Sequence, residues 1–244
     1  MNSGQITFLG HSSVRLTLPD ERVILIDPWL ANNPSCPAGE KTQPRCDYIA
    51  LTHGHSDHTE DVPALVQQHS PKVVTNFDFA GILESACSGG QFCGMNLGGT
   101  QVIDDLKFTM TRAFHSSGYS TKDGLLYAGM PGGFVIEAPG LATVYHAGDT
   151  DVFSDMSLID ELYAPKIIML PIGDHFTMGP KGAAIAAKYF DPTAIIPMHY
   201  ATFPVLTGTV DAFKQHLGPD LANRVVAMKP GDSVGWTDGG TAGG

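Results

Sequence analysis

The feature that most constrains this chain is the segment His53-Gly54-His55-Ser56-Asp57-His58. It follows Tyr48–Leu51, an apolar run that predicts a short buried strand. Because alternate side chains of an extended segment point the same way, His53 and His55 can face one metal ion. Asp57 and His58 lie where the chain turns towards a helix, and they can face a neighbouring ion. Imidazole and carboxylate are the ligands that zinc uses in catalytic sites, so the segment predicts a metal centre at a strand end.

Short apolar runs separated by turn residues recur along the chain and predict an α/β fold. The expected strands are Ile6–Leu9, Val14–Leu18, Val23–Ile26, Tyr48–Leu51, Val73–Thr75, Lys107–Thr111, Gly133–Glu137, Ala142–His146, Ile167–Leu170, Ala194–Pro197 and Ser233–Trp236. The expected helices are Thr59–His69, Phe79–Cys87, Ala183–Phe190 and Thr209–Leu217. The order strand, loop, helix, strand occurs twice at an offset of about 120 residues, which indicates an internal duplication into two similar β/α halves.

Glycine and proline mark the segments expected to lack regular structure. Three of them are predicted to be loops that carry substrate specificity: Ala31–Arg45, Gly89–Thr100 and Gly118–Pro131. The Gly-rich end, Asp238–Gly244, predicts a flexible tail. The remaining residues, 1–237, are expected to form a single domain, since a chain with 43% hydrophobic residues can bury a sizeable core.

The charge balance narrows the class of partner. The chain has 25 acidic and 14 basic residues, a formal net charge of −11, and no run of lysine and arginine. Such a surface repels phosphate backbones and anionic lipids, so we expect a small-molecule substrate and neither a nucleic acid nor a membrane partner. The first residues show no signal peptide, and the four cysteines form no C-x-x-C pair. Both features are typical of a cytoplasmic protein with free thiols.

The H-x-H-x-D-H string after a strand resembles the signature of the metallo-β-lactamase superfamily, and the resemblance covers nearly the whole chain. It implies a four-layer αββα sandwich and three further metal ligands, each after a strand. His115, Asp149 and His199 occupy these places in order. The resemblance implies two sets of ligands around two ions. The first ion is held by His53, His55 and His115, the second by Asp57, His58 and His199, and Asp149 bridges both.

Three further segments resemble one branch of the superfamily, the metal-dependent hydrolases related to ascorbate-phosphate lactonases. These are Gly10-His11-Ser12-Ser13, Ile26-Asp27-Pro28 and Gly173–Pro180. His11 is a candidate to donate a hydrogen bond to the substrate or to a developing oxyanion. His175 stands where asparagine is usual in the branch and is a candidate pocket residue. Asp27 and His146 are expected to support the ligands rather than to bind metal.

The ligand set implies a hydrolase. Two cations about 3.5–4 Å apart share a water and lower its pKa towards about 7, and the resulting metal-bridging hydroxide attacks the substrate. The expected bond is an ester, lactone, amide or phosphoester of a small molecule, with Asp57 both binding metal and orienting the nucleophile. Zinc is the expected metal, and Mn²⁺, Fe²⁺ and Ni²⁺ are alternatives. The alternative functions are a β-lactamase, a phosphodiesterase or a non-catalytic metal-binding scaffold, and the branch resemblance suggests a homo-oligomer.

Overall fold

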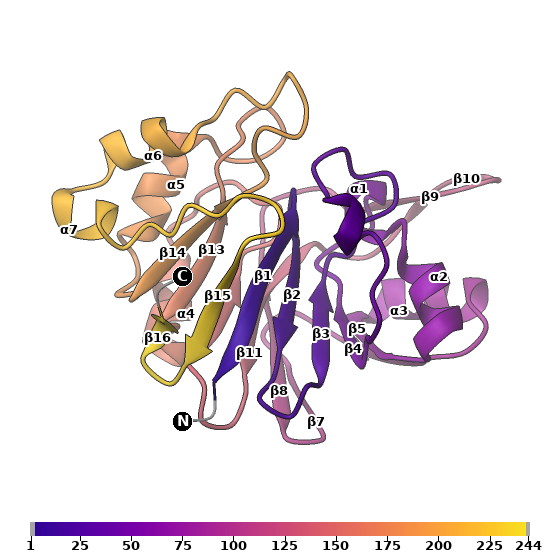
Figure 1. Ribbon diagram of the computed structural model, residues 1–244. Helices are drawn as coiled ribbons and strands as arrows, with labels where there is room; N and C mark the ends of the chain where they lie inside the picture. Colours follow the sequence, from indigo (N-terminus) through magenta and orange to yellow (C-terminus); the bar gives the residue numbers. More distant parts are fainter. Residues whose placement is uncertain (1–2, 243–244) are drawn as a thin grey trace.

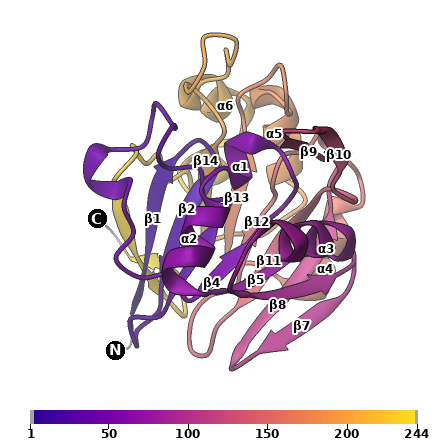
Figure 2. The ribbon, with the colours of Figure 1, turned by 90° about the vertical axis from the view of Figure 1, so that its right-hand side faces the viewer.

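The computed structural model describes residues 3–242 and shows two β-sheets packed face to face with helices on both outer sides (Figure 1, Figure 2). The main hydrophobic core lies between the sheets. It joins Phe8 and Ile26 of one sheet to Phe108, Phe134 and Ile168 of the other. This is the expected four-layer αββα sandwich.

The first sheet has the strand order β16-β15-β1-β2-β3-β4-β5-β6. Its strands are β1 Gly4–Gly10, β2 Ser13–Thr17, β3 Val23–Ile26, β4 Tyr48–Ala50, β5 Lys72–Asn76, β6 Gln91–Met95, β15 Ser233–Thr237 and β16 Gly240–Ala242. The first three strands form an antiparallel meander, and β3 to β6 run parallel. Three helices belong to this half: α1 Ser56–Thr59, α2 Val62–His69 and α3 Phe77–Ala86. A single-turn 3-10 helix, η1 Ala38–Glu40, interrupts the loop that follows β3.

The second sheet has the order β14-β13-β12-β11-β8-β7. Its strands are β7 Thr100–Ile103, β8 Leu106–Arg112, β11 Gly132–Glu137, β12 Val144–His146, β13 Ile167–Pro171 and β14 Ala194–Met198. Its helices are α4 Met156–Tyr163, α5 Pro180–Ala187, α6 Val210–His216 and α7 Pro219–Ala222. Here too an antiparallel portion leads into parallel strands, β12 to β14. The two halves therefore share a plan, as the sequence predicted.

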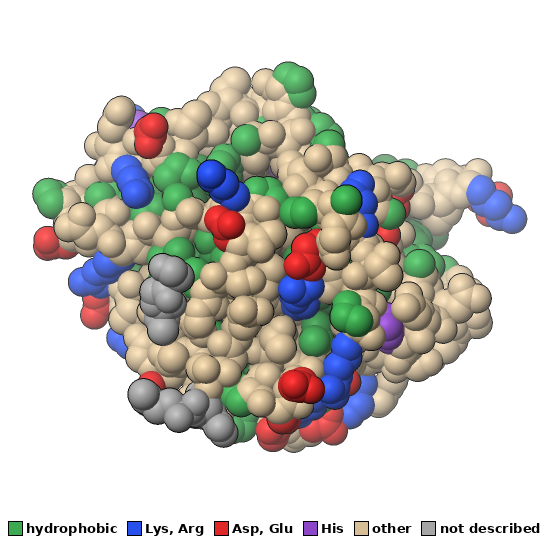
Figure 3. Space-filling view, viewed as in Figure 1, with side chains coloured by type: hydrophobic (Ala, Val, Ile, Leu, Met, Phe, Trp, Pro, Cys, Tyr) green, Lys and Arg blue, Asp and Glu red, His purple; other side chains and the backbone are tan. Residues whose placement is uncertain are grey.

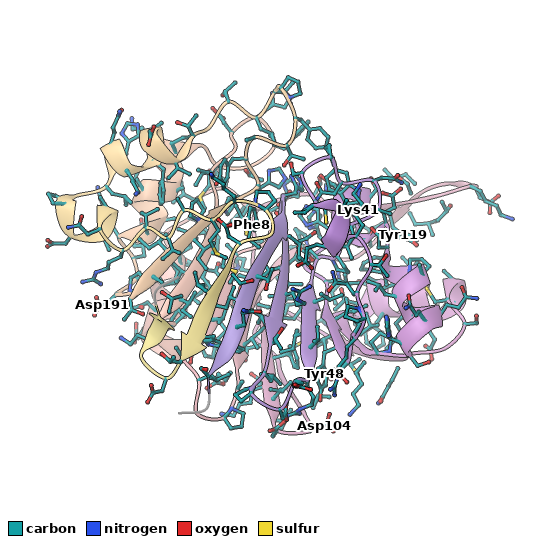
Figure 4. The ribbon with its side chains drawn as sticks, viewed as in Figure 1. Phe8, Lys41, Tyr48, Asp104, Tyr119 and Asp191 are labelled. Carbon is teal, nitrogen blue, oxygen red and sulfur yellow. The ribbon has the colours of Figure 1, made fainter. Side chains whose placement is uncertain are left out.

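Polar contacts join the two sheets at the end away from α1. The Tyr48 hydroxyl donates to Asp104 in the turn between β7 and β8, at 2.6 Å (Figure 4). Arg22 donates to both carboxylate oxygens of Asp105 in the same turn, at 2.6 and 2.9 Å. These contacts close one end of the sandwich.

The structure differs from the sequence expectations in several segments. Gly89–Thr100 is not a loop throughout, because β6 lies within it as an edge strand paired with β5. The expected helix Thr59–His69 begins later, at Val62, as α2, and Pro63 in its first turn explains this start; Thr59 instead ends the short helix α1. The expected tail begins with a hairpin, since β16 pairs with β15, while residues 243–244 lie outside the described part of the chain. None of the described helices is long and apolar enough to cross a membrane.

Candidate metal centre

The predicted ligands all follow strands or begin a helix at one edge of the sandwich, the edge at which α1 lies in Figure 1. The segment with His53 and His55 follows β4. His115, Asp149 and His199 follow β8, β12 and β14. Residues at the carboxyl ends of parallel strands meet at the same sheet edge, which is why ligands far apart in sequence converge.

One set of imidazoles consists of His53, His55 and His115. His53 Nε2 lies 2.9 Å from His55 Nδ1, and His115 Nε2 lies 3.3 Å from the same atom. One ring nitrogen from each residue falls within 4.8 Å of the others. Burial is the largest effect on the pKa of His53 and holds it well below its usual value, so this imidazole is neutral at neutral pH. Neutral imidazoles that converge so closely form a site for a cation.

A second set consists of Asp57, His58 and His199, and the structure adds His11. Ligand atoms of all four residues lie within 4.8 Å of one another. His11 Nε2 is 3.1 Å from Asp57 Oδ2, and the ring centroids of His11 and His199 are 3.9 Å apart. One carboxylate among imidazoles is again a donor set that suits a divalent cation.

Asp149 lies between the two sets. Its Oδ2 is 3.0 Å from His199 Nε2, 3.4 Å from His58 Nε2 and 3.6 Å from His115 Nε2. One carboxylate oxygen thus reaches ring nitrogens of both sets, which is the position that the resemblance gave to a bridging ligand.

Buried polar atoms at the centre test whether a metal fits. His199 Nδ1 and Asp149 Oδ1 are buried and have no hydrogen-bond partner among the described residues, and His58 Nε2 has only the distant Asp149 Oδ2, at 3.4 Å. An unpaired buried polar atom is costly, and a bound cation would pair the lone pairs of a carboxylate and a neutral imidazole. The residues present therefore fit a metal centre.

Asp27 contacts the ring of one predicted ligand, His58, and the side chain of Thr52. Its Oδ2 is 2.8 Å from His58 Nδ1 and accepts the Thr52 hydroxyl at 2.6 Å. The same hydroxyl lies 2.9 Å from His53 Nδ1. A partner on one ring nitrogen directs the other nitrogen towards a metal, so Asp27 orients His58 directly and His53 through Thr52.

His146 ties together two segments that carry site residues. Its Nε2–H donates to the Ser12 carbonyl at 3.0 Å, and its Nδ1 accepts the Gly148 amide at 3.2 Å. His146 thereby holds the turn after His11 next to the segment of Asp149. The ring nitrogens are both engaged by backbone, in line with the expected supporting role.

Several residues of the site have a left-handed backbone conformation. The φ angles of His11, Asp27 and His199 are 59°, 46° and 54°, although none of these residues is glycine. The His199 amide donates to the His11 carbonyl at 2.7 Å, so two of these residues hold each other. Strained backbone of this kind costs about 1–3 kcal/mol per residue and persists where the surroundings over-determine it, commonly at functional sites.

The two residues predicted to act on substrate differ in their placement. His11 is buried and has no free ring nitrogen, because Nδ1 lies 2.9 Å from the Thr202 hydroxyl oxygen and Nε2 faces Asp57. In the structure His11 contacts Asp57, and a direct bond from His11 to the substrate stays a prediction. His175 is exposed, its ring lies against Phe176, and no described contact links it to the metal ligands.

Two threonines of the site were missed by the sequence analysis. Thr52 precedes His53 directly, and Thr202 follows His199 by three residues. Their hydroxyls engage the ring nitrogens of His53 and His11. The only sequence signal for these threonines is their position, since hydroxyl residues beside metal-binding histidines are candidates to orient them.

Charge is strongly coupled within the centre. Burial opposes a charged His58, but Asp149 and Asp27 outweigh it and hold the pKa of His58 well above its usual value. Burial would likewise raise the pKa of Asp149, yet His199 and His58 hold it well below its usual range. Before metal binds, His58 thus keeps a proton at neutral pH.

We expect metal uptake by protein stripped with a chelator to release at least one proton, because His58 must lose its proton to bind a cation, and hydroxide formed on the ions adds to the count. Metal affinity then rises with pH until the pH exceeds the raised pKa of His58. Metal affinity falls as the pH is lowered below that pKa. Titration calorimetry in two buffers of different ionisation enthalpy measures the proton count. A zero count at pH 7 would contradict this assignment of the proton to His58.

Comparisons with known proteins agree with the geometry. A sequence profile for the β-lactamase superfamily domain matches residues 22–200. The chain is 44% identical over 229 residues to a UPF0173 metal-dependent hydrolase of Koribacter versatilis, covering 94% of this chain and 97% of the relative. A UPF0173 metal-dependent hydrolase of Rubrobacter xylanophilus is 45% identical, with 95% and 96% covered.

A solved structure supports the same assignment. Igni18, a metallo hydrolase of the archaeon Ignicoccus hospitalis, superimposes with a TM-score of 0.83 at 34% identity, covering 96% of this chain and 98% of that chain. An isothiocyanate hydrolase from Delia radicum gut bacteria shares the fold, with a TM-score of 0.68 at 17% identity and 96% and 99% covered. The chain therefore belongs to the β-lactamase superfamily and, within it, to the UPF0173 family of metal-dependent hydrolases.

Proposed function

We propose that this hydrolase binds two divalent metal ions, with zinc as the metal, and cleaves an ester, lactone, amide or phosphoester bond of a small molecule. The observation that carries the proposal is the position of Asp149, whose Oδ2 lies within 3.6 Å of ring nitrogens from both sets of ligands. A carboxylate shared by two imidazole-rich sets is an arrangement for two ions rather than one.

Seven residues would hold the ions. The first site takes His53, His55 and His115, the second takes Asp57, His58 and His199, and Asp149 serves both. The ions supply Lewis acidity and lower the pKa of water to near neutrality. Zinc suits an imidazole-rich set, and the same ligands accept Mn²⁺, Fe²⁺ or Ni²⁺.

Asp57 is the residue of the chain best placed to act on the attacking water. Burial would raise its pKa, but the hydrogen bond from His11 and the charge of His58 lower it, so the carboxylate remains ionised. One oxygen is engaged by His11, and the side chain keeps 28% of its surface exposed. The second oxygen can therefore orient a water by accepting a hydrogen bond from it.

His11 positions Asp57. Burial lowers the pKa of His11 to about 4, so the ring is neutral at neutral pH. A neutral imidazole has one donor and one acceptor. With Nε2–H donated to Asp57, Nδ1 accepts the Thr202 hydroxyl. This chain of contacts fixes the carboxylate, and it connects the turn after β1 to the segment after β14.

A small molecule is the proposed substrate class, in place of nucleic acid. The formal net charge of −11 opposes a polyanion. The face seen in Figure 3 mixes acidic and basic side chains and shows no continuous basic surface. A cavity of about 510 Å³ beside His55 and His115 has the size of a small-molecule pocket.

Metal analysis and a substrate panel test this proposal. We expect about two metal ions per chain after loading with zinc, and hydrolysis of at least one ester, lactone, amide or phosphodiester that stops on chelation and returns with zinc. Phenyl esters, lactones, a β-lactam and a phosphodiester would form the panel. A loaded protein that is inactive on every member would favour a metal-binding scaffold, and one ion per chain would refute the two-metal site.

A further inference from the structure

The chain between His115 and β11 forms a separate two-stranded sheet. It consists of β9 Gly118–Thr121 and β10 Gly124–Tyr127, paired antiparallel. This hairpin projects from the body of the protein on the right of Figure 1, and Figure 3 shows it standing clear of the surface. It begins three residues after His115, a ligand of the proposed metal centre.

Ser117 and Ala128, which flank the two strands and form the root of the hairpin, contact the metal-binding segment. The Gly54 amide donates to the Ser117 hydroxyl oxygen at 3.2 Å, and that hydroxyl donates to the Ala128 carbonyl at 3.2 Å. A Cβ on Gly54 would lie 2.5 Å from the Cβ of Ala128. The hairpin root therefore packs directly on the backbone between the first two histidines of the motif.

A second clamp holds the other side of the root. The side-chain amide of Asn76 (Nδ2) donates to the Ala128 carbonyl at 2.7 Å and to the Met130 carbonyl at 3.3 Å. Tyr119 also lies at this end of the hairpin (Figure 4), with its ring 5.2 Å from that of Phe79. Two clamps fix the orientation of the hairpin relative to the metal ligands, so its faces belong to the geometry of the site.

Residues of strand β10 line the cavity beside the metal centre. The cavity of about 510 Å³ is lined by His55 and His115 and, from the hairpin and the residues after it, by Leu125, Leu126, Tyr127 and Met130. Leu125 and Tyr127 are two positions apart in β10, so their side chains share a face. No lysine or arginine lines this cavity among the described residues.

These apolar side chains are unusually exposed. Leu125 is 73% exposed, Tyr127 66% and Met130 55%. Adjacent exposed apolar side chains mark a surface that binds something. Because they line the same cavity as His55 and His115, a group bound against them lies beside the metal centre.

We propose that Leu125, Tyr127 and Met130 form a subsite for an uncharged alkyl or aryl group of the substrate, next to the bond that is cleaved. This inference rests on the proposed function and adds a substrate class to it. Apolar surface removed from water on both partners supplies the binding free energy. The lining offers no cationic side chain to pair with a charged group, so neutral apolar substrates are favoured over phosphorylated or acidic ones.

Binding of alkyl hydroxamates to the zinc-loaded protein tests the subsite without requiring turnover. Acetohydroxamate and octanohydroxamate share a metal-binding head and differ in the chain that would meet the hairpin. We expect octanohydroxamate to bind at least about tenfold tighter, because each methylene in an apolar pocket contributes measurably to discrimination. The Leu125→Ser/Tyr127→Ser double variant should lose this preference and keep the affinity for acetohydroxamate.

Leu162→Ser is the matched control. Leu162 is 68% exposed and lines a different cavity beside α4, so its replacement should leave the preference unchanged. Equal affinities of the wild-type protein for the two hydroxamates, or a preference that survives in the double variant, would overturn the proposal. If the double variant instead changes only the oligomeric state in light scattering, the hairpin is a contact between copies of this chain and the subsite is refuted. Lack of turnover on every member of the substrate panel would refute the proposed function while leaving the hydroxamate result to decide the subsite.

Discussion

Replacing Asp149 with asparagine is expected to lower the metal content to one ion or fewer and to reduce kcat/KM on the best substrate of the panel by about a thousandfold or more, since a lost metal removes several kcal/mol of transition-state stabilisation. Asparagine keeps the shape of the side chain and removes its charge. The carboxylate is buried, and one oxygen faces three imidazoles. An amide at this place cannot neutralise two cations.

Asp151→Asn is the control for the substitution at Asp149. Asp151 lies two residues further along the same segment and is exposed, and its side chain accepts, among the described residues, only the Val152 amide at 2.7 Å. Metal content by plasma mass spectrometry and turnover should both stay within about twofold of the wild type, as for most surface substitutions. If Asp149→Asn retained two ions and full activity, Asp149 would not be the shared ligand.

The second large effect is expected from Asp27→Ala, which should weaken metal binding by about 10–100-fold and destabilise the chelated protein by about 3–5 kcal/mol. Asp27 is completely buried and accepts the Thr52 amide at 2.8 Å and the Thr52 hydroxyl at 2.6 Å. It also faces His58 Nδ1 at 2.8 Å. Its removal leaves a buried imidazole and a buried threonine without their common partner.

Two comparisons separate the roles of charge and shape at Asp27. Asn tolerates the left-handed backbone of this residue, whose φ is 46°, so Asp27→Asn should fold more stably than Asp27→Ala. It should still bind metal more weakly than the wild type, because an amide cannot supply a charged partner to His58. Glu84→Ala removes an exposed carboxylate of α3 and should shift the free energy of unfolding by no more than about 0.5 kcal/mol. Chemical unfolding and competition with a chromogenic chelator measure the two effects, and a wild-type metal affinity for Asp27→Ala would contradict the orienting role.

The strands were predictable where their pattern is local and apolar. Val23–Ile26 and Ile167–Leu170 are continuous apolar runs, and both are fully buried strands in the structure. The edge strand β6 was missed because Gln91-Phe92-Cys93-Gly94-Met95 is only partly buried and has no alternation. Its conformation depends on pairing with β5 rather than on its own side chains.

The sequence of the hairpin next to the metal centre contains a turn signal that predicts two paired strands. The segment from Gly118 to Pro131 was expected to be a loop because it is rich in glycine. Asp123-Gly124 stands at the turn of the hairpin, and this pair is a recognised turn signal between two strands. The pairing was thus accessible from sequence, but the direction in which the hairpin points was not.

His175 and His11 illustrate the limit for site residues. Both lie in segments that resemble the branch of hydrolases, and both were expected to meet the substrate. Asp174 and His175 adopt left-handed backbone with φ of 67° and 62°, and the imidazole lies exposed against Phe176. His11 instead faces inward, where its contacts are with Thr202 and Asp57. No periodicity in a loop fixes where such a side chain points.

The sequence by itself determined the kinds of ligand and their places at strand ends, because both follow from local patterns of apolar and metal-binding residues. It also determined the order of strands and helices that builds an α/β sandwich. Only the tertiary structure decided how the atoms meet: that Asp149 lies between two sets of imidazoles, that His11 bonds to Thr202 across 191 residues, and that an apolar hairpin walls the cavity beside His115. These arrangements depend on the packing of distant segments, which no stretch of sequence specifies alone.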